Sequence, residues 1–171
     1  MDQVLINNWN SRVGKNDLVI FLGDFMFKQK YKVAHYIDQL DGYVTFIKGN
    51  HDNKKSLNTR ITSLILDIDG QLVFCNHFPE SFSNRFNINL VAHSHDKWKI
   101  RKIYNTYLVN VGVDAWNYYP VDFNGILKLI ESYKRMKLKE KRIVEGLETY
   151  KLQRNLFKDK IANPPKKLEN L

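Results

Sequence analysis

The chain has 171 residues, of which 43% are apolar and 13% aromatic, and this composition supports a folded core and excludes wholesale disorder. No apolar run approaches the roughly 20 residues of a membrane span and no signal peptide is visible, so we expect no membrane partner. The low cysteine content fits a reducing compartment, and we expect a cytoplasmic protein. One cysteine, Cys75, excludes an internal disulfide.

The net charge of +9 is unevenly distributed. Residues 131–171 carry 12 basic and 6 acidic side chains, whereas residues 1–130 carry 15 and 12. We therefore expect a domain over 1–130 and a basic tail over 131–171. Such a tail fits either a solvated helical surface or a contact with nucleic acid.

The first half of the chain alternates predicted helices and strands. Periodic apolar residues predict helices over 3–13 and 29–40, and continuous apolar runs predict strands buried on both faces over 18–22 and 43–47.

The rest of the predicted domain is richer in strands. Two apolar runs around Asp69-Gly70 predict a hairpin over 61–75, and further strands are expected over 88–92 and 104–111. Asp122 can cap a helix. The chain after it is rich in Lys, Arg, Glu and Leu, and this composition predicts a helix to about residue 160. The fold class is therefore α/β (α+β) with a basic helical extension.

Polar residues with metal-binding capacity directly follow the predicted strands. Four of the five histidines lie at strand ends, together with a carboxylate and an amide: Asp24, Asn50, His51, His77, His93 and His95. The carboxyl ends of strands are where sites assemble in α/β sheets. Imidazole, carboxylate and amide ligands suit Mn, Fe, Zn or Ni better than Ca or Mg, and a neutral asparagine keeps such a site electropositive towards a phosphate.

These segments resemble the calcineurin-like metallophosphoesterases, and among them the small single-domain bacterial and phage members. The resemblance covers about residues 1–130 and is carried by Gly23-Asp24, Gly49-Asn50-His51-Asp52, Asn76-His77 and His93-Ser94-His95, with a further likeness over 110–121. It implies a β-sandwich flanked by helices and a hydrolase that cleaves a phosphomonoester or phosphodiester with a water activated by two divalent metals, manganese being the expected ion.

The resemblance also implies a role for each matching residue. Asp24 would bridge the two metals, and His95 would serve the second of them. Asn50, His77 and His93 would complete the shell of the first. The catalytic residues would be His51, beside the leaving-group oxygen, and Asp52, which would orient His51.

The sequence departs from this family in one motif. No Asp-x-His is present, and the opening helix resembles the segment that follows that motif, so the first strand of the sheet is expected to be missing. Three explanations stay open: a truncated product, a split enzyme whose motif comes from another chain, or a degenerate member that binds one metal or none. In the last two cases the chain would act with a partner, or as a nucleic-acid-binding or interaction protein. The aromatic residues Trp98, Trp116, Tyr118 and Tyr119 fit either a substrate groove or core packing.

Overall fold

The computed structural model of the chain describes residues 2–26, 31–52 and 57–162, with the side chains of the long C-terminal helix described as far as 154. The chain divides into two units, residues 1–129 and residues 130–171. Within the described residues no helix is both long and apolar enough to cross a bilayer.

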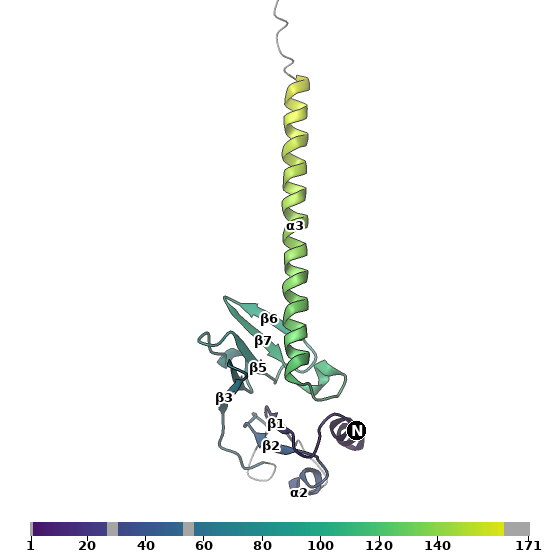
Figure 1. Cartoon of the computed structure of the whole chain (residues 1–171), viewed down its shortest axis with the longest axis vertical. Helices are drawn as coiled ribbons and strands as arrows, with labels where there is room; N and C mark the ends of the chain where they lie inside the picture. The colour runs from purple at the N-terminus through teal and green to yellow at the C-terminus, as the bar shows by residue number, and fades with distance from the viewer. Residues whose placement is uncertain (1, 27–30, 53–56, 163–171) are drawn as a thin grey trace, which may run out of the picture. The chain divides into compact units, whose positions relative to one another are not determined.

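The N-terminal unit is built on two sheets (Figure 1). The smaller sheet pairs β1 (Leu18–Phe21) with β2 (Tyr43–Phe46) in parallel. The larger has the strand order β3-β4-β5-β7-β6. Its strands are β3 (Ser63–Ile68), β4 (Gln71–Asn76), β5 (Ile88–Val91), β6 (Ile100–Ile103) and β7 (Thr106–Asn110).

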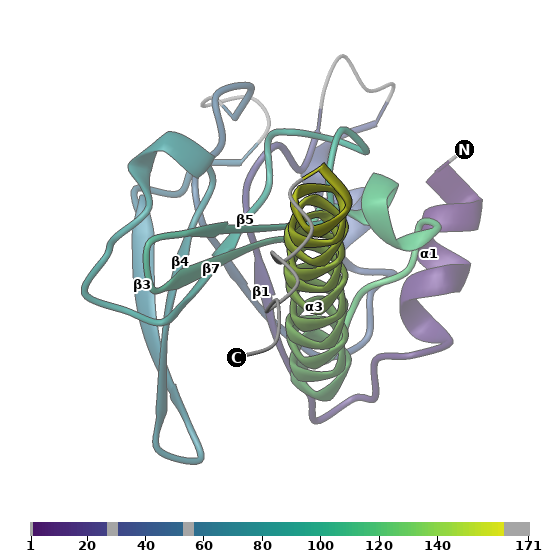
Figure 2. The same cartoon turned by 90° about the horizontal axis from the view of Figure 1, so that it is seen from above.

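The larger sheet is mixed. The pairs β3–β4 and β6–β7 are antiparallel, whereas β4, β5 and β7 run parallel to one another, side by side in Figure 2. β5 is buried along its whole length, as expected for a central parallel strand. The predicted hairpin over 61–75 and the α/β fold class are confirmed.

Helices cover the smaller sheet. The helices α1 (Asp2–Asn10) and α2 (Val33–Ile37) contribute Ile6 and Tyr36 to a cluster that also holds Met26. Trp9 of α1 stacks on Phe21 of β1 with ring centroids 6.3 Å apart, and its indole N–H donates to the carbonyl of Asp41 at 2.8 Å. The stacking of Trp9 on Phe21 packs α1 against the smaller sheet.

Three expectations differ from the structure. α2 is shorter than the predicted helix over 29–40, of which residues 29 and 30 lie outside the described residues. β1 and β2 are half-buried and begin at an exposed residue, because they lie in a two-stranded sheet and not at the centre of a wide one. β6 was not predicted, since Ile-Arg-Lys-Ile lacks an apolar run; it is the edge strand beside β7.

The remaining elements are two short 3-10 helices, η1 (Pro79–Ser81) and η2 (Val113–Trp116), and the helix α3 (Phe123–Ala162). The carboxyl group of Asp122 accepts the N–H of Gly125 at 2.6 Å, as expected of the predicted helix cap.

Candidate metal centre

The candidate site lies where strand ends from the two sheets meet. Asp24 follows β1, Asn50 follows β2, His77 directly follows β4, and His93 follows β5. Because β1 and β2 are parallel, and β4 and β5 are parallel, each pair directs its carboxyl ends to one edge of its sheet. The structure brings these four side chains together.

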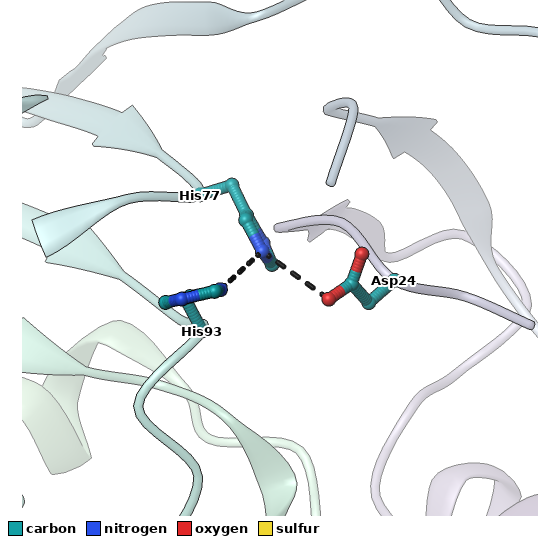
Figure 3. Close-up of side chains that lie close together, drawn as sticks. All are labelled: Asp24, His77 and His93. Atoms are coloured by element: carbon teal, nitrogen blue, oxygen red, sulfur yellow. Dashed lines mark hydrogen bonds and ion pairs between the residues drawn. The ribbon is translucent and has the colours of Figure 1, made fainter. Parts of the chain in front are cut away.

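The four side chains point their ligand atoms at one place. The ligand atoms of Asp24, His77 and His93 all lie within 4.8 Å of one another (Figure 3). His77 Nε2 is 3.3 Å from Asp24 Oδ2 and 3.1 Å from His93 Nδ1. Asn50 Oδ1 is 2.9 Å from each of the two imidazole nitrogens. A metal that binds nitrogen and oxygen at about 2.0–2.2 Å holds adjacent ligands about 3 Å apart, so these separations fit one ion.

The tautomer of His77 is set by a backbone carbonyl. The Nδ1–H of this buried ring donates to the carbonyl oxygen of Leu22 at 2.6 Å. With the proton on Nδ1, the neutral form of the ring would present a lone pair on Nε2 towards the carboxylate oxygen of Asp24 and the amide oxygen of Asn50. Metal-binding histidines are usually oriented in this way, by a hydrogen bond from the ring nitrogen that does not bind the metal. A cation among these lone pairs would remove their mutual repulsion, so the donor set fits a divalent transition metal.

Two glycines allow the loops after β1 and β2 to approach each other. Gly23 has φ +89, and a Cβ there would lie 2.6 Å from the Gly49 Cα and 2.7 Å from His77 Nδ1. A Cβ on Gly49 would collide with the backbone nitrogen and the carboxyl group of Asp24. Any side chain at either position would displace Asp24 or His77.

The buried side chain of Asp52 joins the loops after β1 and β2 by hydrogen bonds. Its buried carboxylate accepts the backbone N–H groups of Asp24 and Gly49, both at 2.8 Å, and that of Phe25 at 3.1 Å. The orientation of His51 by Asp52 stays a prediction.

Three of the predicted ligands are among the seven described residues other than glycine that have a positive φ. Asp24, His93 and His95 have φ values of 61, 61 and 49, in the left-handed region that residues other than glycine rarely adopt. Strain of this kind persists where the surrounding contacts enforce it, and it gathers at functional sites.

The other two predicted histidines lie beside the cluster and not within it. The backbone N–H of His51 donates to Asp24 Oδ1 at 2.8 Å, and its side chain is exposed. His95 Nδ1 pairs with Asp114 Oδ2 at 2.8 Å. The buried Asn110 donates to the carbonyls of His95 at 2.5 Å and Trp98 at 2.8 Å, and so fixes the loop after His93. The predicted roles of His51 and His95 stay predictions.

Sequence reasoning missed three contacts of this site. The Leu22 carbonyl carries no side-chain signal, and Asp114 lies 19 residues from its partner His95. Phe78 packs edge-on against His77, with ring centroids 4.7 Å apart, and lies 5.1 Å from His93 by the same measure. Only its position directly after His77 could have suggested it.

A pocket of about 610 Å³ adjoins the cluster and shares Asn50 and His77 with it. Its volume lies in the range of small-molecule sites. Besides these two residues and Gly49, the pocket is lined by one lysine, one carboxylate, hydroxyl and amide groups, and two aromatic rings: Lys48, Asp52, Thr62, Ser63, Ser81, Asn76, Phe74 and Phe78.

The fold and this site define an α/β protein with a candidate centre for a divalent metal. The chain is 33% identical over 141 residues to the uncharacterized protein MJ1445 of Methanocaldococcus jannaschii, a match that covers 78% of this chain and 77% of that protein. The chain therefore belongs to the family of MJ1445. No protein-family model matches the sequence.

Several solved structures match this chain, among them the following two. A protein of unknown function from Aquifex aeolicus, AQ665, matches with a TM-score of 0.58 and 20% identity over 75% of this chain and 84% of that one. A conserved Streptococcus pneumoniae protein described as a predicted phosphoesterase matches with a TM-score of 0.43 and 17% identity, over 65% of each chain.

Proposed function

We propose that the chain is a metal-dependent phosphoesterase that hydrolyses a phosphomonoester or phosphodiester. One observation carries the proposal: the lone pairs of Asp24, Asn50, His77 and His93 converge from two sheets, with separations that suit one divalent ion. Manganese is the ion we expect, with iron, zinc or nickel as the other candidates for this donor set.

A divalent ion held by these residues would lower the pKa of a bound water and offset the charge of the phosphoryl group. The protein's own part is to hold the ligands in place. His77 is oriented by the carbonyl of Leu22. The backbone N–H of Asp24 donates to the carboxylate of Asp52, and the carboxylate of Asp24 accepts the backbone N–H of His51. Asn50 adds an oxygen without a negative charge, which favours an anionic substrate.

The same proposal assigns the residues around the cluster. His51 would hold the proton that the leaving-group oxygen receives, since its backbone is anchored to Asp24 and its side chain is exposed. His95 would bind a second metal, for which Asp24 would be the shared ligand. Lys48, in the adjoining pocket, would contact the rest of the substrate.

The test measures metal binding and turnover separately. We expect the purified chain, stripped with a chelator and dialysed against Mn²⁺ or Zn²⁺, to retain metal and to hydrolyse p-nitrophenyl phosphate or bis-p-nitrophenyl phosphate. His93→Ala should weaken metal binding at least tenfold, because this exposed ring supplies one of four ligands. His35→Ala is the matched control, since His35 lies on α2 and outside the cluster.

Two results would count against this function. Equal metal retention by the wild-type chain and by His93→Ala would refute the site itself. Stoichiometric metal without turnover of either substrate would refute the hydrolase and favour a chain that binds nucleic acid or a partner protein.

The second candidate function, nucleic-acid binding, rests on the charge of α3. Lys139, Arg142 and Lys151 make no ion pair with any acidic side chain in the part of the chain that the structure describes. These cations would contact phosphates, so binding of labelled RNA or DNA should weaken steeply with salt. A flat salt response, or unchanged binding after removal of residues 131–171, would exclude this role for the helix.

A further inference from the structure

The edge strand β6 and the three residues before it concentrate the positive charge of the N-terminal unit. Residues 97–103 contain no acidic side chain and four exposed cations: Lys97, Lys99, Arg101 and Lys102. Residues 1–130 have 15 basic and 12 acidic side chains, a net charge of +3, and subtracting these four cations leaves −1. The positive charge is therefore collected at one edge of the larger sheet. We call these four cations, together with Trp98 and Trp116, the basic patch.

No carboxylate neutralises the cations of the basic patch. In the part of the chain that the structure describes, none of the four makes an ion pair. The acidic residue before them, Asp96, is exposed, and Asp114 pairs with His95 instead. Charges on an edge strand discourage pairing with another strand, but that role needs no aromatic partners. It therefore leaves the two tryptophans unexplained.

The two tryptophans hold two of the cations in place. Nζ of Lys99 lies 4.0 Å from the centre of the Trp116 ring, and Cζ of Arg101 lies 4.6 Å from the centre of the Trp98 ring. Neither ring belongs to the buried core, so both lie at the surface beside their cations. Contacts of this kind contribute about 0.5–1 kcal/mol at exposed sites. They also restrict two long side chains, so less conformational entropy is lost when these cations bind an anion.

Buried Asn110 connects the basic patch to the candidate metal centre. Its side-chain amide donates to the carbonyl of Trp98 at 2.8 Å and to the carbonyl of His95. Its backbone carbonyl accepts the indole N–H of Trp116 at 2.8 Å. The candidate ligand His93 lies two residues before His95. One buried residue thus fixes both tryptophans and the loop that follows a ligand of the centre.

A single strand of nucleic acid has the chemistry that the basic patch fits. Lysine and arginine contact the phosphates of such a strand, and its unpaired bases stack on indole rings and on guanidinium planes. The patch offers both kinds of group, with the guanidinium of Arg101 already stacked on Trp98. A duplex or an acidic peptide would use the cations alone. The position of the patch, next to a loop of a candidate phosphoester centre, favours nucleic acid over a peptide.

We propose that the basic patch binds a single strand of RNA or DNA and places a phosphodiester of that strand beside the metal centre. The proposal makes nucleic acid the substrate class, and in this respect it rests on the proposed hydrolase. Binding itself requires only the cations and rings of the patch, so it is measured without metal and without turnover. The patch lies in residues 1–129, apart from the cations of α3 that the second candidate function uses.

Two double variants of equal charge test the patch. Lys99→Gln with Arg101→Gln removes the stacked cations, and the control, Lys15→Gln with Arg85→Gln, removes two exposed cations elsewhere in the same unit. Fluorescence anisotropy in a chelator measures binding of a labelled oligothymidylate of about eight nucleotides over a salt series. The patch variant should bind about tenfold more weakly than the control. Its slope of log affinity against log salt should be shallower by about 1.4, because each of two lost contacts contributes about 0.7.

A second pair of substitutions, Lys97→Gln with Lys102→Gln, leaves both tryptophan contacts in place and should weaken binding in the same direction. Circular dichroism checks that each variant is folded. Equal binding by the patch variant and the control, or equal salt slopes, would overturn the proposal. Tighter binding of a DNA hairpin than of the single strand would also overturn it, and so would displacement of the strand by polyglutamate at equal charge, which would indicate an acidic protein partner.

The binding assay separates this proposal from the hydrolase. A wild-type chain that hydrolyses p-nitrophenyl phosphate but does not bind the oligonucleotide would refute the basic patch and leave the hydrolase in place. A chain that binds the oligonucleotide through the patch but retains no metal would refute the hydrolase and the substrate class, and would leave the patch as a binding surface.

Discussion

Replacing Asp52 with alanine removes the carboxylate that joins the loops after β1 and β2. Three backbone N–H groups, those of Asp24, Phe25 and Gly49, then lose their acceptor inside the protein. A hydrogen bond to a charged group contributes about 1.5–3 kcal/mol. Because the three bonds share one side chain their contributions do not add fully, and we expect a loss of about 3–5 kcal/mol in the free energy of unfolding.

Urea denaturation followed by tryptophan fluorescence measures this loss. With a slope of about 1–3 kcal/mol per molar urea, the midpoint should fall by about 2 M. Asp52→Asn keeps the volume but turns an N–H donor towards the backbone donors, so it should also be strongly destabilising. Asp17→Ala is the control, because this carboxylate is exposed and accepts one bond, from the N–H of Gly14 at 2.8 Å; it should cost about 1 kcal/mol. If neither Asp52 variant lost more than Asp17→Ala, the bracing role would be refuted.

Two further changes test the glycine after β1 and the buried cysteine on β4. Gly23→Ala should lower the urea midpoint and weaken metal binding together, because φ is +89 there and the new Cβ would contact His77; unchanged metal affinity would contradict the close approach. Burial raises the pKa of the Cys75 thiol from 9.0 to about 12, so the native thiol should react with a disulfide reagent at pH 8 only after unfolding. Since the folded-state pKa is the higher one, stability should fall as the pH rises from about 9 towards 12, and Cys75→Ala should show a smaller fall over this range.

Most strands are readable from local sequence because their apolar runs are bounded by turns. The hairpin of β3 and β4 follows from alternating apolar residues around Asp69-Gly70, where both residues have positive φ. β6 escapes such reading because Arg101 and Lys102 interrupt its apolar pattern. It is a strand only because β7 offers backbone partners at the edge of the sheet, where charged side chains are tolerated.

The candidate site also has features that the local sequence predicts and features that only tertiary contacts determine. The residue types and their places after strands are local properties, and they identify six candidates: Asp24, Asn50, His51, His77, His93 and His95. The resemblance to a known family implied that four of these, Asp24, Asn50, His77 and His93, share one metal. Which lone pair His77 presents, and that His95 turns to Asp114, depend on contacts between segments 55 and 19 residues apart. Spacing along a chain sets the direction of a side chain within one strand, but the packing of one sheet against another sets which strand ends meet. The local pattern therefore determined the donors, and only the packed sheets decided how they converge.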